Sequence, residues 1–401
     1  MRFFLGGVPF GCDNIGDEAI LAAIVSILRR NFENPEITVS TADPEGTSAR
    51  LGVECVPLYV FRKDLPIGGL REALSRCDAF VWAGATGLSD YPETALDILS
   101  EARKAGLKTV VWGVGMNSRL NPAFYSVRGK KLALCRLLGR LCFGAFDFAA
   151  ALERGLAART RARIASELRN CRLLVARDEA TRRELLKCSA DLDVTVGADS
   201  AVIFDAPDLS RLEALGGGAL GLLEDGTRKI GLCVSSQGAV SDLRALAACL
   251  DSILEPEDRR LFFIPMNPKT DSGLMRAIRP LMARGSRAFD VGCLGPEDVV
   301  AAASRCDVVV SSRLHLLILS ANVSTPIVGI ARGSKVDNFL GAFGLESAGT
   351  VDDCDFAALA EGVERGLAGR KDFARVRDAA YAGFGERLSA AEKKLARALG
   401  D

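Results

Sequence analysis

The chain has 401 residues and no net charge, because 51 Lys and Arg balance 51 Asp and Glu. This length exceeds that of one average domain, and the balanced charge argues against a nucleic-acid partner, which binds basic surfaces. The first residues turn to Gly and Pro too early for a secretory signal, and no run of about 18 apolar residues could span a membrane. We therefore expect a cytoplasmic protein of two or more domains.

The first 205 residues alternate short apolar runs with longer helical patterns. We predict strands at 1–7, 77–84, 108–115 and Leu173–Ala176, and helices at 17–32 and 93–106. Such alternation is typical of a parallel sheet covered by helices. Residues 1–205 are therefore interpreted as a Rossmann-like domain.

A basic segment, residues 119–172, interrupts this alternation. It holds twelve Lys or Arg against Asp147, Glu153 and Glu167, an excess of about nine positive charges in a neutral chain. Two interpretations are open. The segment is either a solvated pair of helices with arginine stems packed on the core, or a surface that rests on anionic lipid.

A second α/β series follows a weakly patterned linker at 206–228. Its predicted strands are 228–237, 259–267, 287–293, 306–312 and 325–330, and its predicted helices are 241–254, 272–285, 296–305 and 313–323. We expect a C-terminal Rossmann-like domain at 229–355 and terminal helices at 356–401 that could pack back on the first domain. The predicted fold is α/β, with two facing doubly wound domains and a cleft between them.

His315, the only histidine, lies in "SSRLHLLILS" at 311–320. Val308–Val310 should form a buried strand, and the helix that follows should place His315 in its first turn and Arg313 in the turn before it. A helix N-terminus after a strand favours an anion, which an arginine can clamp at two points. The alternatives are a structural histidine and an Arg313 that pairs with a neighbouring carboxylate.

Three other loops follow predicted strands and should meet the same cleft. "ARGSKVDNFL" offers Lys335 as a point cation. Arg177 comes directly after Leu173–Ala176 and either binds an anion or pairs with Asp178. The N-terminal loop "GGVPFGCDNIGDEAIL" lacks the GxGxxG pattern of phosphate sites. Its side chains suit sugar hydroxyls better, and the candidates there are Asn14, Asp17 and Glu18.

Twelve cysteines are scattered without a CxxC pair, which favours reduced core residues over metal ligands or disulfides. We expect neither a metal nor a cofactor.

The chain resembles the polysaccharide pyruvyl transferase family. The resemblance rests on "GCDNIGDEAIL", "VARDEAT" and "SSRLHLLILSANVSTPIVGIARGSKVDNFL", in this order along most of the chain. It implies two domains of the GT-B type and transfer of pyruvyl from phosphoenolpyruvate to two sugar hydroxyls, giving a cyclic ketal. By position, Arg177, Arg313 and Lys335 would bind phosphoenolpyruvate, and His315 would be the general acid. The chain departs from the family pattern at two places. Many members have a run of glycines after a strand, where this chain has "AGATGL", and an arginine at a strand end is common where this chain has "VSSQG".

The resemblance further implies a polysaccharide of the cell envelope, or its lipid-linked precursor, as acceptor. With such an acceptor, the basic segment 119–172 would hold the enzyme at the inner face of the cytoplasmic membrane. Two other functions remain open. One is a GT-B glycosyltransferase with a nucleotide-sugar donor, although "RLHLLILSANV" lacks the carboxylate that commonly holds the ribose. The other is a non-catalytic relative that binds sugars or anions.

Overall fold

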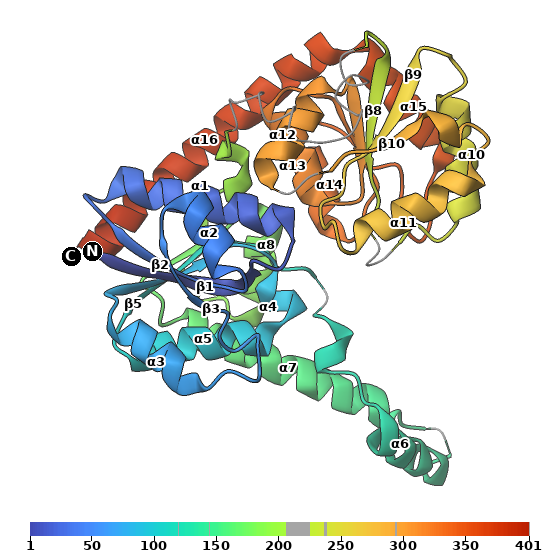
Figure 1. Cartoon of the computed structure of the whole chain (residues 1–401). Coiled ribbons are helices and arrows are strands. Elements are labelled where there is room, and N and C mark those ends of the chain that lie inside the picture. The colour runs from blue at the N-terminus through green and yellow to red at the C-terminus, as the bar shows by residue number, and fades with distance from the viewer. Residues whose placement is uncertain (119, 144, 206–224, 236–238, 293–294, 401) are drawn as a thin grey trace.

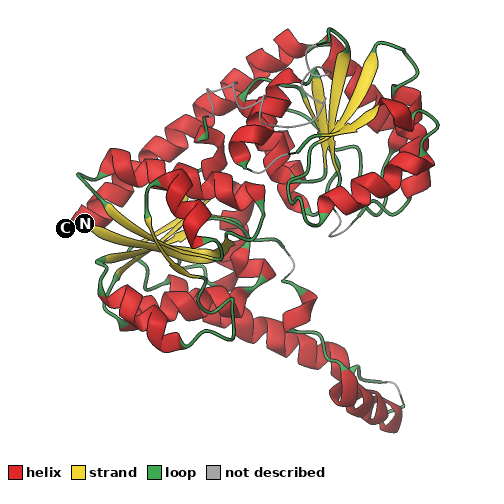
Figure 2. Ribbon diagram, viewed as in Figure 1, coloured by secondary structure: helices red, strands yellow, loops and turns green. Residues whose placement is uncertain are grey.

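The computed structural model describes all residues except 119, 144, 206–224, 236–238, 293–294 and 401. It contains two α/β domains, each with helices on both faces of a central sheet (Figures 1 and 2). Every strand pair in the two sheets is parallel. The predicted fold class is therefore confirmed.

The N-terminal sheet has seven strands in the order β3-β2-β1-β4-β5-β6-β7. Its strands are β1 Arg2–Phe10, β2 Glu36–Thr41, β3 Glu54–Pro57, β4 Ala79–Ala83, β5 Lys108–Val114, β6 Leu173–Ala176 and β7 Thr195–Val196. Its helices are α1 Ile15–Asn31, α2 Pro44–Leu51, α3 Ile67–Ser75, α4 Gly87–Asp90, α5 Pro92–Lys104, α6 Gly129–Leu141, α7 Phe148–Leu168 and α8 Glu179–Cys188. The central strands are buried on both faces, as continuous apolar runs in a parallel sheet require.

The C-terminal sheet has five strands in the order β10-β9-β8-β11-β12. Its strands are β8 Arg228–Cys233, β9 Arg259–Phe263, β10 Ala288–Asp290, β11 Val308–Ser311 and β12 Ile327–Gly329. Its helices are α10 Leu243–Ile253, α11 Asp271–Ile278, α12 Pro296–Arg305, α13 Leu314–Asn322, α14 Ser334–Gly341 and α15 Phe356–Ala368. The helix predicted at 272–285 ends at Ile278, because Pro280 cannot continue it, and a short 3-10 turn follows.

Helix α16, Arg370–Gly400, runs from the C-terminal domain along the side of the N-terminal domain (Figure 1). Near its start, Arg377 donates through Nε to the carbonyl oxygen of Ala321, at 3.0 Å. Near its end, Lys394 donates to Thr195 Oγ1 at 2.9 Å, and Lys108 donates to the carbonyl oxygen of Leu399. The helix therefore joins the two domains along one edge of the molecule.

The two domains also meet beside the cleft. Ile15 N donates to the carbonyl oxygen of Met266 at 2.9 Å, and Asn322 of α13 donates to the carbonyl oxygens of Ala201 and Phe204. Most of the linker predicted at 206–228 lies outside the described residues. The basic segment forms α6 and α7, of which α6 lies at the end of an arm that projects away from the domain (Figure 1).

The cysteines in the described part of the chain are all free thiols. Their burial is mixed: Cys233 and Cys306 are core residues, whereas Cys12 and Cys142 are exposed. No described helix combines the length and the apolar character that crossing a membrane requires.

Candidate active site

A cavity of about 590 Å³ lies where the two domains face each other. Its walls come from the segments that follow β1, β4, β5 and β6 of one sheet and β9, β11 and β12 of the other. The carboxyl ends of parallel strands are the usual ligand-binding edge of such sheets. His315, Arg177, Arg313 and Lys335 all line this cavity.

His315 lies in the first turn of α13 and packs against α1 of the other domain. A Cβ atom added to Gly16 would lie 2.2 Å from His315 Nδ1 and 2.4 Å from its Cγ. Only glycine therefore leaves room for the imidazole at this position. Because Gly16 and His315 belong to different domains, this contact exists only while the domains are packed together.

Asp199 faces the other ring nitrogen. His315 Nε2 and Asp199 Oδ2 are 3.6 Å apart, and both atoms are buried without a hydrogen bond to any described residue. The other oxygen of Asp199 accepts from Ala201 N at 3.1 Å, which fixes the carboxylate. Burial raises the pKa of Asp199, but the interactions with His315 and Arg177 outweigh burial and hold the pKa below its ordinary value. The ionised carboxylate of Asp199 therefore faces the imidazole at ion-pair distance.

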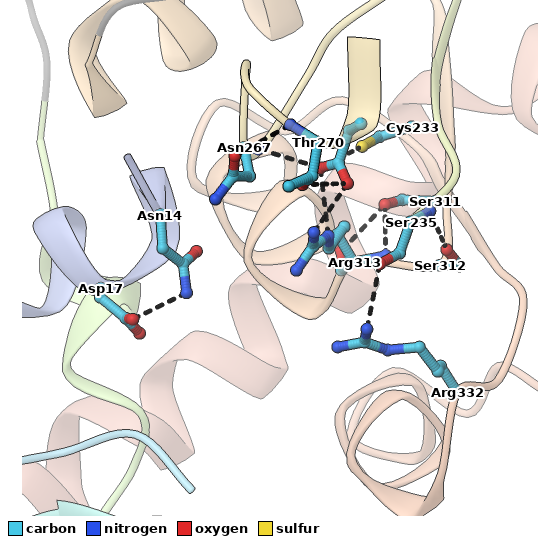
Figure 3. A network of polar contacts seen from close by, with 11 residues as sticks. Asn14, Asp17, Cys233, Ser235, Asn267, Thr270, Ser311, Ser312, Arg313 and Arg332 are labelled. Atoms are coloured by element: carbon cyan, nitrogen blue, oxygen red, sulfur yellow. Dashed lines mark hydrogen bonds and ion pairs between the residues drawn. The ribbon is translucent and has the colours of Figure 1, made fainter. Parts of the chain in front are cut away.

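Arg313 immediately precedes α13 and is held by a buried carboxylate (Figure 3). Its Nε and Nη2 donate to the two oxygens of Asp271, at 3.1 and 2.7 Å, and Asp271 is fully buried. Ser311 Oγ accepts from Arg313 N at 2.9 Å, which shapes the turn. The pairing that the sequence left open is thus present. It occupies one edge of the guanidinium and leaves Nη1 as the donor for a ligand.

Arg332 and Lys335, which follow β12, add positive charge to the same wall. Arg332 Nη1 donates to Ser235 Oγ at 3.0 Å (Figure 3). Burial, reinforced by the charge of Arg313, lowers the pKa of Arg332. Desolvation, reinforced by Arg332, lowers the pKa of Lys335 to about 8. Burial and mutual repulsion disfavour the charged forms of these side chains, and an anionic ligand would stabilise those charged forms.

Arg177 reaches the cavity from the end of β6 because residue 115 is a glycine. A Cβ atom at Gly115 would lie 2.5 Å from Arg177 Cζ. The guanidinium contacts Asp178 Oδ2 at 3.3 Å and Asp199 Oδ2 at 3.7 Å. Asp178 also caps α8 by accepting from Thr181 N. Arg177 therefore pairs with Asp178 and also lines the cavity, and its role as an anion ligand stays a prediction.

On the N-terminal wall, Asn14 and Asp17 line the cavity and Glu18 does not. Asn14 Nδ2 donates to Asp17 Oδ2 at 2.7 Å. Burial raises the pKa of Asp17 to about 6, against the opposing effect of His315. Glu18, on another face of α1, accepts from Gly11 N at 2.7 Å and forms a salt bridge with Arg50. Glu18 therefore holds the N-terminal loop in place and does not face the cavity.

The cavity is also lined by polar residues that were not predicted from the sequence, among them Asp90, Asn117 and Asn121. Asn117 Nδ2 donates to Asp90 Oδ1 at 3.1 Å, and Asn121 donates to the backbone carbonyl oxygen of Asp90. Asp90 follows the glycine loop after β4, and both asparagines follow β5. Their position after buried strands was the signal that could have identified them.

No group of three or more His, Cys, Asp or Glu that could hold a metal ion occurs among the described residues. The cavity instead places cations on the C-terminal wall and at Arg177, and carboxylate and amide groups on the N-terminal wall. This arrangement can bind an anion on one side and hydroxyl groups on the other, with His315 between them.

Solved structures of several proteins bound to UDP or a UDP-sugar share the fold. Alr3699/HepE of Anabaena, in complex with UDP and glucose, has a TM-score of 0.60 and 11% identity, covering 100% of this chain and 99% of its own. MnaA of S. aureus with UDP has a TM-score of 0.59 and 13% identity, over 94% and 90%. UDP-GlcNAc 2-epimerase of Neisseria meningitidis, bound to UDP-GlcNAc, has a TM-score of 0.57 and 11% identity, over 98% and 99%. These similarities establish the two-domain GT-B type of fold.

Among curated proteins, no sequence matches this chain. A sequence model of one family matches residues 14–334, which include Arg177, Arg313 and His315 and end one residue before Lys335. That match spans more than half of the chain, and the chain therefore belongs to the polysaccharide pyruvyl transferase family.

Proposed function

We propose that the protein transfers the pyruvyl group of phosphoenolpyruvate to two hydroxyls of a sugar, forming a pyruvate ketal. The observation that carries the proposal is the single imidazole beside a cluster of four cations in the interdomain cavity: Arg177, Arg313, Arg332 and Lys335. Phosphoenolpyruvate carries a phosphate and a carboxylate, and this cluster can pair with both. No cofactor is required for the reaction.

The cations would bind the donor and stabilise the departing phosphate by fixed charge. Arg313 is pre-oriented by Asp271, and Arg177 by Asp178, so neither guanidinium must be ordered when the donor binds. Lys335, with a pKa of about 8, gains charge as the donor arrives.

His315 would donate a proton to C3 of phosphoenolpyruvate, and a sugar hydroxyl would bond to the oxocarbenium-like C2. Loss of phosphate from C2 would create a second such centre, which the neighbouring hydroxyl traps to close the ring. Of the two hydroxyl protons, one restores His315 and the other leaves with phosphate. Asp199 would keep the ring in place throughout, because its carboxylate stays ionised beside the imidazole.

The acceptor would lie against Asn14, Asp17, Asp90 and Asn117 on the N-terminal wall. With a pKa of about 6, Asp17 is largely ionised at neutral pH and suits acceptance of a hydroxyl proton. We propose a glycan of the cell envelope, or its lipid-linked precursor, as the acceptor.

The experiment that tests this function follows phosphate release from phosphoenolpyruvate across an array of glycan acceptors. His315→Gln should lower turnover by ~10²-fold or more, the usual scale for loss of a general acid. Calorimetric titration should show that the variant still binds phosphoenolpyruvate. Turnover within a few-fold of the parent chain would make His315 structural and remove this mechanism.

A nucleotide-sugar donor is the competing function, because the structural relatives named above were solved with UDP or UDP-sugars. Helix α13 contains no Asp or Glu with which to hold a ribose. Release of UDP from a UDP-sugar, without phosphate release from phosphoenolpyruvate, would establish the competing function instead.

A further inference from the structure

The arm formed by α6 and the first turns of α7 carries an exposed apolar stripe. Four exposed leucines lie on one face of α6, because position 134 is three and four residues from 137 and 138, and position 141 is three and four residues from 138 and 137. They are Leu134, Leu137, Leu138 and Leu141. The stripe ends at Phe143, which is 99% exposed, and at Phe146, which is also exposed. Monomeric soluble proteins rarely leave such contiguous apolar surface in water.

The opposite face of α6 packs against the rest of the arm. Cys135 is buried there, and α6 packs along α7. Both acidic side chains of the arm are engaged within it, since Asp147 accepts from Ala150 N at 2.9 Å and Glu153 accepts from Val127 N at 2.9 Å. The exposed stripe is therefore not needed for the arm's own packing.

Basic side chains surround the stripe. Lys130, Lys131, Arg136 and Arg140 of α6 are exposed, and none of them forms an ion pair with any residue in the described part of the chain. An apolar stripe flanked by unpaired cations is typical of helices that lie in the interface of an anionic bilayer.

The arginines at the base of the arm behave differently. Arg163 pairs with Asp97, and Arg169 pairs with Asp191 at 2.9 Å. Arg161 donates to the carbonyl oxygen of Ser118 at 3.1 Å. These side chains attach α7 to the N-terminal domain. Lys130, Lys131, Arg136 and Arg140, by contrast, lie on α6 at the far end of the arm, where a flat surface could reach them (Figure 1).

We propose that α6 and the adjoining Phe143 and Phe146 dock the protein on an anionic lipid surface. The leucine stripe would enter the boundary between headgroups and acyl chains, and the lysines and arginines would contact the headgroups. The chain enters this arm directly from Asn117 and Asn121 of the cavity wall. Lipid binding itself does not depend on the proposed reaction.

Vesicle co-sedimentation tests the proposal with phosphatidylcholine alone and with phosphatidylglycerol added, at low and high salt. The full chain should bind only the anionic vesicles, and salt should weaken the binding because it screens the attraction. Changing Lys130, Lys131, Arg136 and Arg140 together to Gln should weaken binding by ~10²-fold or more.

The matched control changes four exposed basic residues elsewhere to Gln: Lys63, Arg244, Lys371 and Lys393. It removes the same net charge and should bind like the parent chain. Equal losses in both variants would mean that overall charge, not the arm, drives binding, and would overturn the proposal. Binding of the parent chain to neutral vesicles at the same strength would also overturn it.

A tryptophan reporter distinguishes lipid from a second protein copy. The natural Trp82 and Trp112 are buried, so Leu141→Trp adds an exposed fluorophore on the stripe. Its emission should shift to the blue when anionic vesicles are added. A blue shift that instead grows with protein concentration in the absence of lipid would identify the stripe as a self-association surface and reject the membrane proposal.

Discussion

The geometry around His315 is set by a few contacts from both domains. Gly16 of α1 lies against one side of the ring, and Asp199 faces Nε2 at 3.6 Å. These two contacts therefore exist only while the domains are packed together. Residues that do not react with substrate can control the reaction by fixing this orientation.

Gly16→Ala should lower turnover by ~10²-fold and leave phosphoenolpyruvate binding nearly unchanged. The added methyl would lie 2.2 Å from His315 Nδ1, so the ring must move, and a small misplacement of a catalytic group is costly. Steady-state kinetics and donor titration should be measured together. The control is Gly385→Ala, whose added Cβ meets nothing within 4 Å. If the two variants have equal activity, Gly16 has no positioning role.

The affinity for phosphoenolpyruvate should fall as pH rises through about 8. Lys335 has its pKa lowered to about 8, so the free protein loses this cation above that pH, and affinity should then drop by ~10-fold per pH unit. Calorimetric titrations on both sides of pH 8 check the slope. Lys335→Arg should bind with little pH dependence in this range, because a guanidinium stays charged. The same slope in this variant would assign the titration to another group.

At the scale of elements, α16 contacts both domains and packs against the N-terminal sheet. Its buried residues recur every three or four positions: Phe384, Leu388, Ala391, Leu395 and Leu399. They belong to the same apolar cluster as the strands of the first domain. A helix at the end of the chain thus completes a core formed near its beginning.

Leu388→Ala should destabilise the folded chain by about 2–5 kcal/mol, the usual cost of truncating a leucine at a buried site. Ser389→Ala, at the exposed neighbouring position on the same helix, should change stability little. Urea unfolding followed by circular dichroism gives both values. A loss below about 1 kcal/mol for Leu388→Ala would mean that α16 contributes little to the N-terminal core.

For the whole molecule, the cavity is a joint property of two domains. Its cations come from both, with Arg177 after β6 and Arg313 and Lys335 after β11 and β12. A donor bound there contacts the two sheets at once and should stabilise them together. Ligand binding and domain packing are therefore coupled.

Phosphoenolpyruvate at a hundred times its dissociation constant should stabilise the protein by about 2.7 kcal/mol. Hydrogen exchange should show protection both near Arg177 and along α13 and α14. UDP at the same concentration serves as the control and should give neither effect. Protection confined to the C-terminal domain would place the donor outside the interdomain cavity, and protection by UDP would favour the nucleotide-sugar function.

The sequence by itself determined the α/β class, the two-domain order and the position of His315 at the start of a helix. Apolar periodicity and the residues at strand ends are local signals, and they are strong where strands are fully buried. The same signals missed β2 and the edge strand β3, whose burial patterns are partial. They also could not distinguish Asp17, which faces the cavity, from Glu18, which pairs with Arg50.

Only the tertiary structure decided which charged groups meet. Asp271 lies 42 residues before Arg313, and Asp199 comes from the opposite domain to His315, so neither pairing has a local pattern. The steric limit at Gly16 likewise exists only because α1 packs on α13. Pairing and desolvation depend on contacts between segments distant in the chain, whereas helix and strand periodicity depends on neighbours. For this reason the sequence located the candidate site, and the packing of the two domains determined its electrostatics.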